Sequence, residues 1–325
     1  MRLGPVVALA LVAGACQRPS QHQEKAPPPV AVPASSPLDE ARRLLKAGDP
    51  DGALGKLREA GSGADALCTQ GVAWAKKAEL APLPTPPPLP NGAARGAAPP
   101  PAPEFKPEEL QALEFFERAL AAQPGHPQAS LGLADLLAPH ALRRHALEQG
   151  AAARRRARRP RGETPAEAGP DFRAERVIQA YRAAIQGDPA SREPVERMIE
   201  LATRVGRLDD TDQGLQELLR RDTERPEPFV RYGDFLLTAR KDPLAAIEQY
   251  RQALIWRPDD TDTKAKIADI YIAQGIESYG KSQYAVAEAR FLDAQKYASD
   301  PRSPQGLKIQ DYMGKLRTIR QPLAK

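Results

Sequence analysis

Three stretches of the sequence repeat one spacing of an aromatic residue, an alanine and a proline, and this repeat constrains the fold most. The stretches are "ALEFFERALAAQPGHP" (112–127), "VIQAYRAAIQGDPAS" (177–191) and "AIEQYRQALIWRPDD" (246–260). The repeated sets are Phe116, Ala119 and Pro124; Tyr181, Ala184 and Pro189; and Tyr250, Ala253 and Pro258. A separation of three places the aromatic residue and the alanine on one face of a helix. Proline ends a helix because it lacks an N–H donor. The pattern therefore predicts a series of helices that end alike.

The segments before these helices carry a second pattern, in which large residues are closely followed by glycine. The stretch "PEPFVRYGDFLL" (226–237) has Phe229, Tyr232 and Gly233 at this spacing. Residues 271–294 supply Tyr271, Gly275, Tyr284, Ala287, Phe291 and Ala294, and residues 41–60 supply Gly48, Ala53, Leu57 and Ala60. Together the patterns resemble the first and second helices of a tetratricopeptide repeat (TPR). The resemblance implies an all-α, right-handed TPR-type solenoid, in which no helix pair buries its apolar face alone.

We expect about six helix pairs in a solenoid that spans residues 38–325. The predicted pairs are 38–61; 64–80 with 107–123; 127–138 with 170–187; 191–205 with 208–222; 226–240 with 243–257; and 261–281 with 282–298. A last amphipathic helix is predicted over 304–320, with apolar positions at Leu307, Tyr312, Met313, Leu316 and Ile319. We expect it to cap the stack, because an end repeat needs a solvated outer face.

Two insertions, both expected to be disordered, interrupt neighbouring pairs at the same turn. Residues 81–107 hold eleven of the 34 prolines, which fits a spacer or a polyproline II ligand. Residues 139–169 hold a basic patch made of Arg154, Arg155, Arg156, Arg158, Arg159 and Arg161. The stack can accommodate both, because the entropy cost of closing a loop rises slowly with its length.

The arginine-rich insertion carries eight arginines against three glutamates, and its net charge of +5 equals that of the whole chain. A solvated loop without a specific role, a site for anionic lipid or lipopolysaccharide headgroups, and a contact with an acidic protein all remain open. Nucleic acid is not expected as a partner, because no aromatic residues are interleaved to stack on bases.

The first sixteen residues predict export. Arg2 precedes an apolar run that ends at Cys16 in "AGAC", and this run is shorter than the ~20 residues that span a bilayer. It resembles a bacterial lipobox, in which a peptidase cuts before the cysteine and the thiol carries a lipid. We predict a signal peptide over 1–15, lipidation of Cys16 and a disordered, proline-rich tether over 16–37. An ordinary cleaved signal and an uncleaved anchor are the alternatives. Gln17 after the cysteine favours, by analogy with Gram-negative lipoproteins, the outer membrane and a periplasmic location.

The sequence carries no familiar catalytic or metal-binding motif. GxSxG, P-loop, HExxH, dinucleotide and CxxC patterns are missing. Cys68 lies at the repeat spacing and is expected to be a buried, unreactive thiol. His140 and His145 are five residues apart and are expected to face solvent. We therefore predict no enzyme, no cofactor, no metal and no small-molecule substrate.

In TPR proteins the first helices line a concave surface that binds peptides or helices. Transferring those positions predicts an acidic partner-binding groove made of Glu193, Glu196, Glu200, Glu227, Val230, Asp234, Leu237, Asp269, Ile272 and Tyr279. Such a surface suits a basic or amphipathic segment of a partner protein. A merely solvated helix face is the alternative.

These features predict a membrane-tethered adaptor that holds a protein partner, with a role in assembling an envelope complex. By resemblance, TPR lipoproteins assist pili, secretion pores and outer-membrane proteins, or organise cell-wall enzymes, and the sequence does not choose among them. A cytoplasmic TPR regulatory protein and an envelope enzyme with a cryptic site on the repeat scaffold remain as alternatives.

Overall fold

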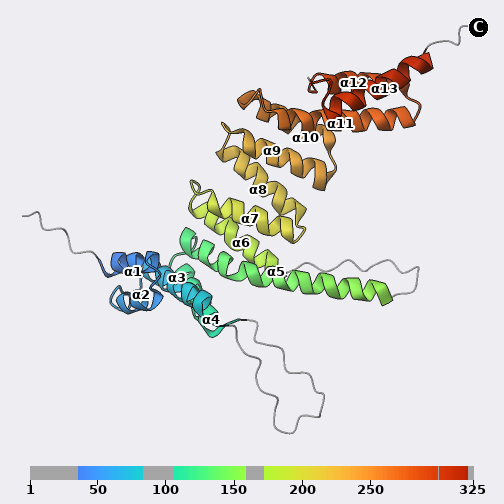
Figure 1. The fold of residues 1–325 in the computed structure, drawn as a ribbon. Coiled ribbons are helices and arrows are strands. Elements are labelled where there is room, and N and C mark those ends of the chain that lie inside the picture. The colour runs from blue at the N-terminus through green and yellow to red at the C-terminus, as the bar shows by residue number, and fades with distance from the viewer. Residues whose placement is uncertain (1–35, 83–104, 159–171, 299, 321–325) are drawn as a thin grey trace, which may run out of the picture. The chain divides into compact units, whose positions relative to one another are not determined.

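The computed structural model describes residues 36–82, 105–158, 172–298 and 300–320, and within these ranges it contains helices and no strand (Figure 1). The helices are α1 (Pro37–Lys46), α2 (Pro50–Leu57), α3 (Ala64–Leu80), α4 (Pro107–Ala122), α5 (Pro127–Arg158), α6 (Phe172–Gly187), α7 (Glu193–Arg204), α8 (Leu208–Arg221), α9 (Pro226–Phe235), η1 (Leu236–Arg240), α10 (Pro243–Trp256), α11 (Thr261–Gly280), α12 (Tyr284–Gln295) and α13 (Pro304–Arg320). The predicted all-α class is confirmed. None of these described helices is long and apolar enough to cross a membrane.

The helices pack in pairs along the chain, as the repeats predict. The most extensive contacts join α1 to α2, α3 to α4, α5 to α6, α7 to α8, α9 to α10 and α11 to α12. Successive first helices also touch, since α3 contacts both α1 and α5, and α5 contacts α7. The last helix, α13, packs on both α11 and α12, which confirms the predicted cap.

A glycine of the first helix lies against the aromatic ring of the second helix in three pairs. A Cβ atom at Gly71, Gly233 and Gly275 would lie 2.7, 2.5 and 2.8 Å from ring atoms of Phe116, Tyr250 and Phe291, respectively. No side chain fits at such distances, so glycine alone allows the ring to reach the helix backbone. All three rings are at most 1% exposed. This contact explains why the two sequence patterns occur together.

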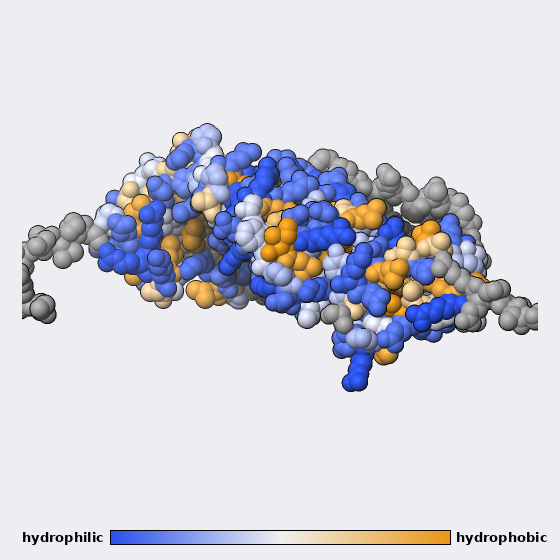
Figure 2. Space-filling view, turned by 90° about the horizontal axis from the view of Figure 1, so that it is seen from above, coloured by the Kyte–Doolittle hydropathy of each residue, from blue (hydrophilic) through white to orange (hydrophobic). Residues whose placement is uncertain are grey.

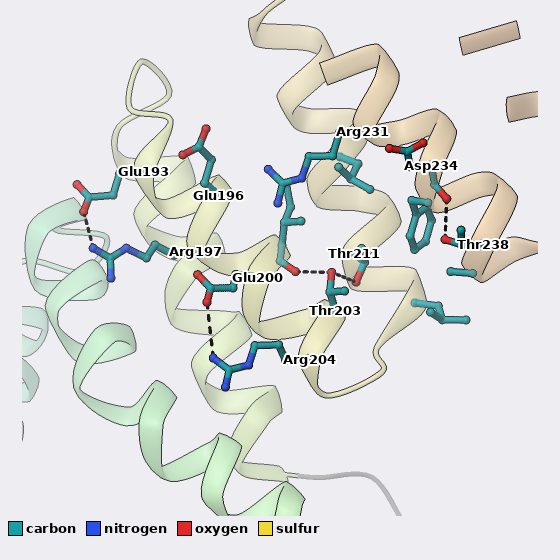
Figure 3. Close-up of a pocket in the computed structure, with 15 residues that line it drawn as sticks. Glu193, Glu196, Arg197, Glu200, Thr203, Arg204, Thr211, Arg231, Asp234 and Thr238 are labelled. Carbon is teal, nitrogen blue, oxygen red and sulfur yellow. Dashed lines mark hydrogen bonds and ion pairs between the residues drawn. The ribbon is translucent and has the colours of Figure 1, made fainter. Parts of the chain in front are cut away.

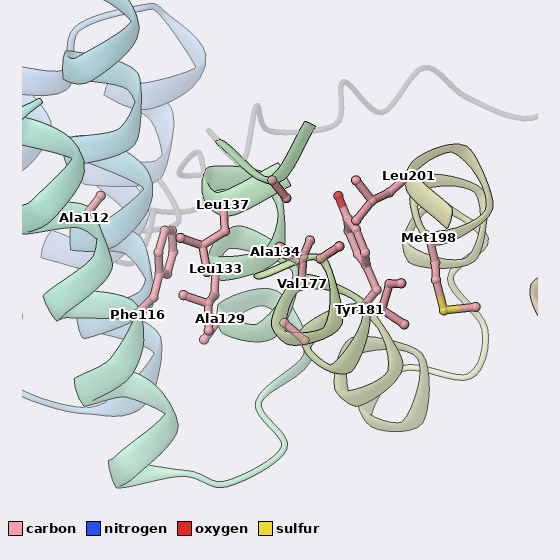
Figure 4. Close-up of a cluster of buried hydrophobic side chains, with 14 of the residues drawn as sticks. Ala112, Phe116, Ala129, Leu133, Ala134, Leu137, Val177, Tyr181, Met198 and Leu201 are labelled. Atoms are coloured by element: carbon pink, nitrogen blue, oxygen red, sulfur yellow. The ribbon is translucent and has the colours of Figure 1, made fainter. Parts of the chain in front are cut away.

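The core is shared between neighbouring pairs. The ring of Phe116 also covers Gly132 of α5, where a Cβ would lie 2.5 Å from the ring. Figure 4 shows the same cluster passing from Phe116 to Leu133 and Leu137 of α5 and on to Tyr181 of α6. Removing one pair would therefore expose the apolar surface of its neighbours.

A tyrosine hydroxyl joins the two helices of a pair in two places. Tyr181 donates to Asp135 at 2.9 Å, and Tyr250 donates to Asp234 at 2.7 Å. A cation of the next first helix faces the same carboxylate, with Arg197 at 3.7 Å from Asp135 and Lys266 at 2.5 Å from Asp234. Burial raises the pKa of both tyrosines, so they remain protonated donors. In these two places the link ties one helix pair to the next.

The proline-rich insertion begins and ends at fixed points. Its residues 83–104 lie outside the described ranges. The ammonium group of Lys106 donates to the carbonyls of Ala78 and Ala81 at 2.6 and 2.7 Å, which satisfies the end of α3. The backbone N–H of Lys106 donates to Glu109, which caps α4. The chain thus leaves and re-enters the stack beside one lysine.

The predicted break of the third pair at residue 139 is wrong. Helix α5 continues to Arg158 with Pro139 inside it. A proline removes one helical hydrogen bond, but the following residues are mainly alanine, arginine and leucine, which are strong helix formers. Arg144 and Glu148 add an ion pair one turn apart, at 2.9 Å. Arg154, Arg155, Arg156 and Arg158 therefore have helical backbone, whereas Arg159 and Arg161 lie outside the described residues.

His140 is buried, contrary to the expectation that it faces solvent. It is 4% exposed, and its ring stacks on Phe105 with 4.1 Å between centroids. Burial lowers the pKa of His140, and Glu109, 3.4 Å away, opposes that shift. His145 is half-buried, and its ring is hydrogen-bonded to Gln149. The burial of His140 depends on Phe105, which lies near the end of the proline-rich insertion, just before α4.

We predict that Phe116→Ala lowers the free energy of unfolding by about 3–5 kcal/mol, because it leaves a cavity between two pairs. Leu110→Ala, on an exposed position of the same helix, is the matched control and should change it by no more than ~0.5 kcal/mol. Urea titrations followed by circular dichroism measure both. Equal shifts of the two midpoints would contradict the shared core.

Candidate functional site

A groove lies between α7 and α9, with α8 behind it, and we call it the α7–α9 groove (Figure 3). Its volume is about 870 Å³. Three helices and the turn η1 contribute side chains to it. Its apolar lining consists of Ile199, Leu208, Leu215, Phe235 and Ala239. The groove is thus a hollow with an apolar floor, and four of the ten residues predicted for a partner surface line it.

The acids of α7 line the groove but do not leave it strongly acidic. Glu193, Glu196 and Glu200 are all exposed and share one face of α7. Each is paired with an arginine four positions away: Glu193 with Arg197 at 3.0 Å, Glu196 with Arg192 at 3.1 Å and Glu200 with Arg204 at 3.6 Å. Exposed pairs of this kind contribute little to stability, but they balance the charge of this wall.

Asp234 lies in the groove and also belongs to the tyrosine link. It accepts hydrogen bonds from the Tyr250 hydroxyl and from the ammonium group of Lys266. Its own backbone carbonyl accepts the Thr238 hydroxyl at 2.6 Å. Most of its hydrogen-bonding capacity is therefore used within the stack. Asp234 holds α9 to α10 and α11, and it is a poor anchor for a partner.

Among the cations that line the groove, Arg231 has no ion-pair partner within the described residues. It lies on α9 one turn before Asp234, and Figure 3 shows its side chain extended into the groove. It forms no ion pair with any residue in the part of the chain that the structure describes. Its guanidinium is exposed and can bind a carboxylate through two parallel hydrogen bonds.

Two threonines and a π-helical turn shape one end of the groove. Thr203 donates to the carbonyl of Ile199 at 2.7 Å and lies 3.4 Å from the hydroxyl of Thr211. Beyond α9, η1 completes the helix with wider turns and ends at Lys241, whose φ of 58° is left-handed. Thr238 and the neighbouring alanine at position 239 reach the groove from this turn. Such turns often occur at functional sites.

The remaining predicted groove residues do not join this site. Glu227 is exposed and pairs with Arg257 at 2.8 Å, while Val230 and Leu237 are half-buried against the core. Asp269 accepts hydrogen bonds from Gln305 of α13.

The prediction for Ile272 is wrong. Ile272 is 3% exposed and belongs to the cluster that includes Ile309 and Leu316 of α13. Tyr279 packs edge-on against the rings of Tyr284 and Tyr312. The cap covers this part of the predicted surface, because α13 lies on α11 where a further first helix would lie.

Several groove residues were missed by the sequence analysis. Leu208, Thr211 and Leu215 belong to a second helix, which the family resemblance assigns to the outer side of the stack. Arg231 could have been found, since positions 227, 231, 234 and 238 follow one helical face. The apolar floor cannot be predicted from the sequence, because the exposure of its residues depends on how far apart α7 and α9 lie.

Other predicted functional residues have different outcomes. Cys68 is 2% exposed, which confirms its predicted burial, and this burial raises the pKa of its thiol to about 11, so the thiol is neutral near pH 7. Cys16 lies outside the described residues. Within the described ranges, no three His, Cys, Asp or Glu side chains gather as metal ligands would.

Comparisons with known proteins find similar structures but no similar sequence families. No family model and no curated protein match the chain. A TPR protein of Thermus thermophilus is 17% identical, with 72% of this chain and 96% of that chain covered and a TM-score of 0.36. PilF of Pseudomonas aeruginosa is 15% identical, with coverages of 86% and 96% and a TM-score of 0.39. The C-terminal part of a TPR protein of Cytophaga hutchinsonii is 12% identical, with coverages of 87% and 89% and a TM-score of 0.42. Values of this size identify no function.

We predict that Asp234→Lys destabilises the stack by about 1–3 kcal/mol, because it removes the acceptor of a buried tyrosine hydroxyl. It also places a second ammonium group beside Lys266. Glu196→Lys, on an exposed position of the same groove, should stay within ~0.5 kcal/mol of the wild type. Urea midpoints distinguish the two, and an unaltered midpoint for Asp234→Lys would show that the tyrosine link contributes nothing.

Proposed function

We propose, from the premise that this chain is a stack of TPR-type helix pairs, that it is a protein-binding scaffold whose α7–α9 groove holds a segment of a partner. The observation that supports this most is the combination of an apolar floor with a charged and hydroxyl-bearing rim. Apolar side chains of a partner would gain burial on the floor. The rim would supply hydrogen bonds for the backbone of the segment.

The dimensions of the groove suit a short peptide segment. Its α7 wall runs from Glu193 to Arg204, which corresponds to about 16 Å at the helical rise of 1.5 Å per residue. An extended segment of about five residues has the same length. A groove open along this length accommodates a chain that enters at one end and leaves at the other.

The charges of the groove favour an amphipathic segment over a strongly basic one. The acids of α7 are each balanced by a neighbouring arginine, so they attract cations less than isolated acids would. Arg231 offers a position for one carboxylate of the segment. The proposed partner therefore presents an apolar side chain to the floor and an acidic group beside it.

We predict that Leu208→Glu reduces partner binding about tenfold or more, since a carboxylate on the apolar floor costs at least ~1.4 kcal/mol of binding. Leu244→Glu is the matched control, because both leucines are exposed near the start of a second helix and only Leu208 lines the groove. Immobilised variants are compared for the proteins that they retain from a cell-envelope extract. Equal retention by both variants contradicts the groove as the binding site.

We further propose that the scaffold is a lipoprotein of the cell envelope, in which it serves the assembly of an envelope complex. The support is the sequence of residues 1–16, with its short apolar run and "AGAC" ending at Cys16. Stable anchoring needs more than one acyl chain, and a mature bacterial lipoprotein generally carries several. The predicted tether over 16–37 would join this anchor to the stack.

Mass spectrometry of the mature chain tests this placement. We expect an N-terminal Cys16 that carries acyl chains, with residues 1–15 removed. An intact Met1 would contradict it and would favour the cytoplasmic regulatory protein.

A further inference from the structure

The second half of α5 extends beyond the helices that pack on its first half, and we call residues 143–158 the arginine arm. Among the side chains of α5 that the structure describes, the last buried one is that of Ala141. Arg173, near the start of α6, lines the same small cavity as His140 and Ala141. Because α6 begins at Phe172, the turns of α5 after this point extend past the start of α6, as Figure 1 shows.

Most residues at the start of the arm are exposed, and none of residues 143–152 is fully buried. Arg143, Arg144 and Glu148 face solvent, and Leu147 is 74% exposed. Figure 2 shows a mostly hydrophilic surface in which hydrophobic residues form separate groups. A leucine this exposed among arginines contrasts with the buried leucines in the first half of the same helix.

The arm concentrates positive charge that it does not balance itself. Residues 143–158 contain six arginines and one acid, Glu148, so their net charge is +5. Arg144 pairs with Glu148 at 2.9 Å. By contrast, the α7 arginines Arg192, Arg197 and Arg204 each face an acid on their own helix. The arginines of α7 are therefore paired with acids of the same helix, whereas the arm contains too few acids to pair with its arginines.

A helix with this composition gains from an anionic surface. Isolated helices of about 15 residues are marginal in water, and like charges one turn apart destabilise them further. Positions 154 and 158 are such a pair. A surface of phosphate groups would remove the repulsion and would bind guanidinium groups through two hydrogen bonds each. The arm would then be held as a helix by its ligand.

We propose that the arginine arm binds the phosphate headgroups of an anionic lipid surface. The helical period places positions 144, 148, 151, 155 and 158 on one face, with Leu147 beside them. This face carries three arginines against one acid, Glu148, which pairs with Arg144. The excess of positive charge beside an exposed leucine suits the boundary between headgroups and acyl chains. Nucleic acid is the weaker ligand, because the arm has no aromatic residue to stack on bases.

This inference does not depend on the α7–α9 groove or on the lipid anchor. The full chain carrying Cys16→Ser, which cannot be lipidated at that position, is used so that only the arm is tested. Binding is measured by co-sedimentation with vesicles of phosphatidylcholine containing 30% phosphatidylglycerol, and with vesicles of phosphatidylcholine alone. We expect binding to the anionic vesicles, no binding to the neutral ones, and a marked loss in 0.5 M salt because the contacts are electrostatic.

The triple variant Arg144→Glu, Arg155→Glu, Arg158→Glu should bind the anionic vesicles about 100-fold more weakly. The matched control is Arg58→Glu, Arg302→Glu, Arg317→Glu, which changes the net charge equally at exposed positions of the stack. It should retain binding. Far-UV circular dichroism and a thermal melt confirm that both variants keep the stack folded.

Three results would overturn the proposal. Equal losses in the two triple variants would show that total charge, and not the arm, controls binding. Unreduced binding by the arm variant would place the lipid contact elsewhere. A chain that binds duplex DNA or polyglutamate but not the anionic vesicles would assign the arm to another class of partner.

Discussion

The packing of an aromatic ring against the backbone of a glycine is the contact on which the rest of this structure depends. Three rings pack in this way on the first helix of their pair, those of Phe116, Tyr250 and Phe291. Burying a side chain of this size contributes about 1.5–3 kcal/mol, and the close approach also fixes the distance between the two helices. With that distance set, the remaining faces of the pair are presented to the next one. The stack, and the groove within it, follow from how these pairs are spaced.

The polar links determine what the groove can do. Asp234 lines it, yet its carboxylate is used by Tyr250 and Lys266, just as Asp135 is used by Tyr181 in an earlier pair. The exposed acids of α7 are balanced by arginines on the same helix. What remains available to a partner is the apolar floor, the hydroxyl groups and Arg231. Asp234 thus lines the groove, but its main role is to stabilise the packing of the helices.

The sequence predicts the helix pairs well because glycine, aromatic residue and proline mark a local geometry that repeats. It predicts less wherever a contact joins distant segments. Ile272 is buried because α13 covers it, and His140 is buried because Phe105 returns from the insertion to stack on it. The sequence does not predict the full length of α5, because proline usually ends a helix, whereas here alanine and arginine continue the helix beyond it. The floor of the groove depends on the gap between α7 and α9, which no local pattern encodes.

The most direct test of the glycine–ring contact combines Gly275→Ala with Phe291→Ala and measures the free energy of unfolding of each variant. In a helix interior, Gly→Ala alone favours folding by about 1 kcal/mol. Here a Cβ at Gly275 would lie 2.8 Å from the Phe291 ring. We predict that Gly275→Ala destabilises the wild-type chain but stabilises the chain that carries Phe291→Ala, in which the ring is absent. The same stabilising effect in both backgrounds would show that the ring does not pack on this glycine, which would contradict the proposed role of the glycine–ring contact.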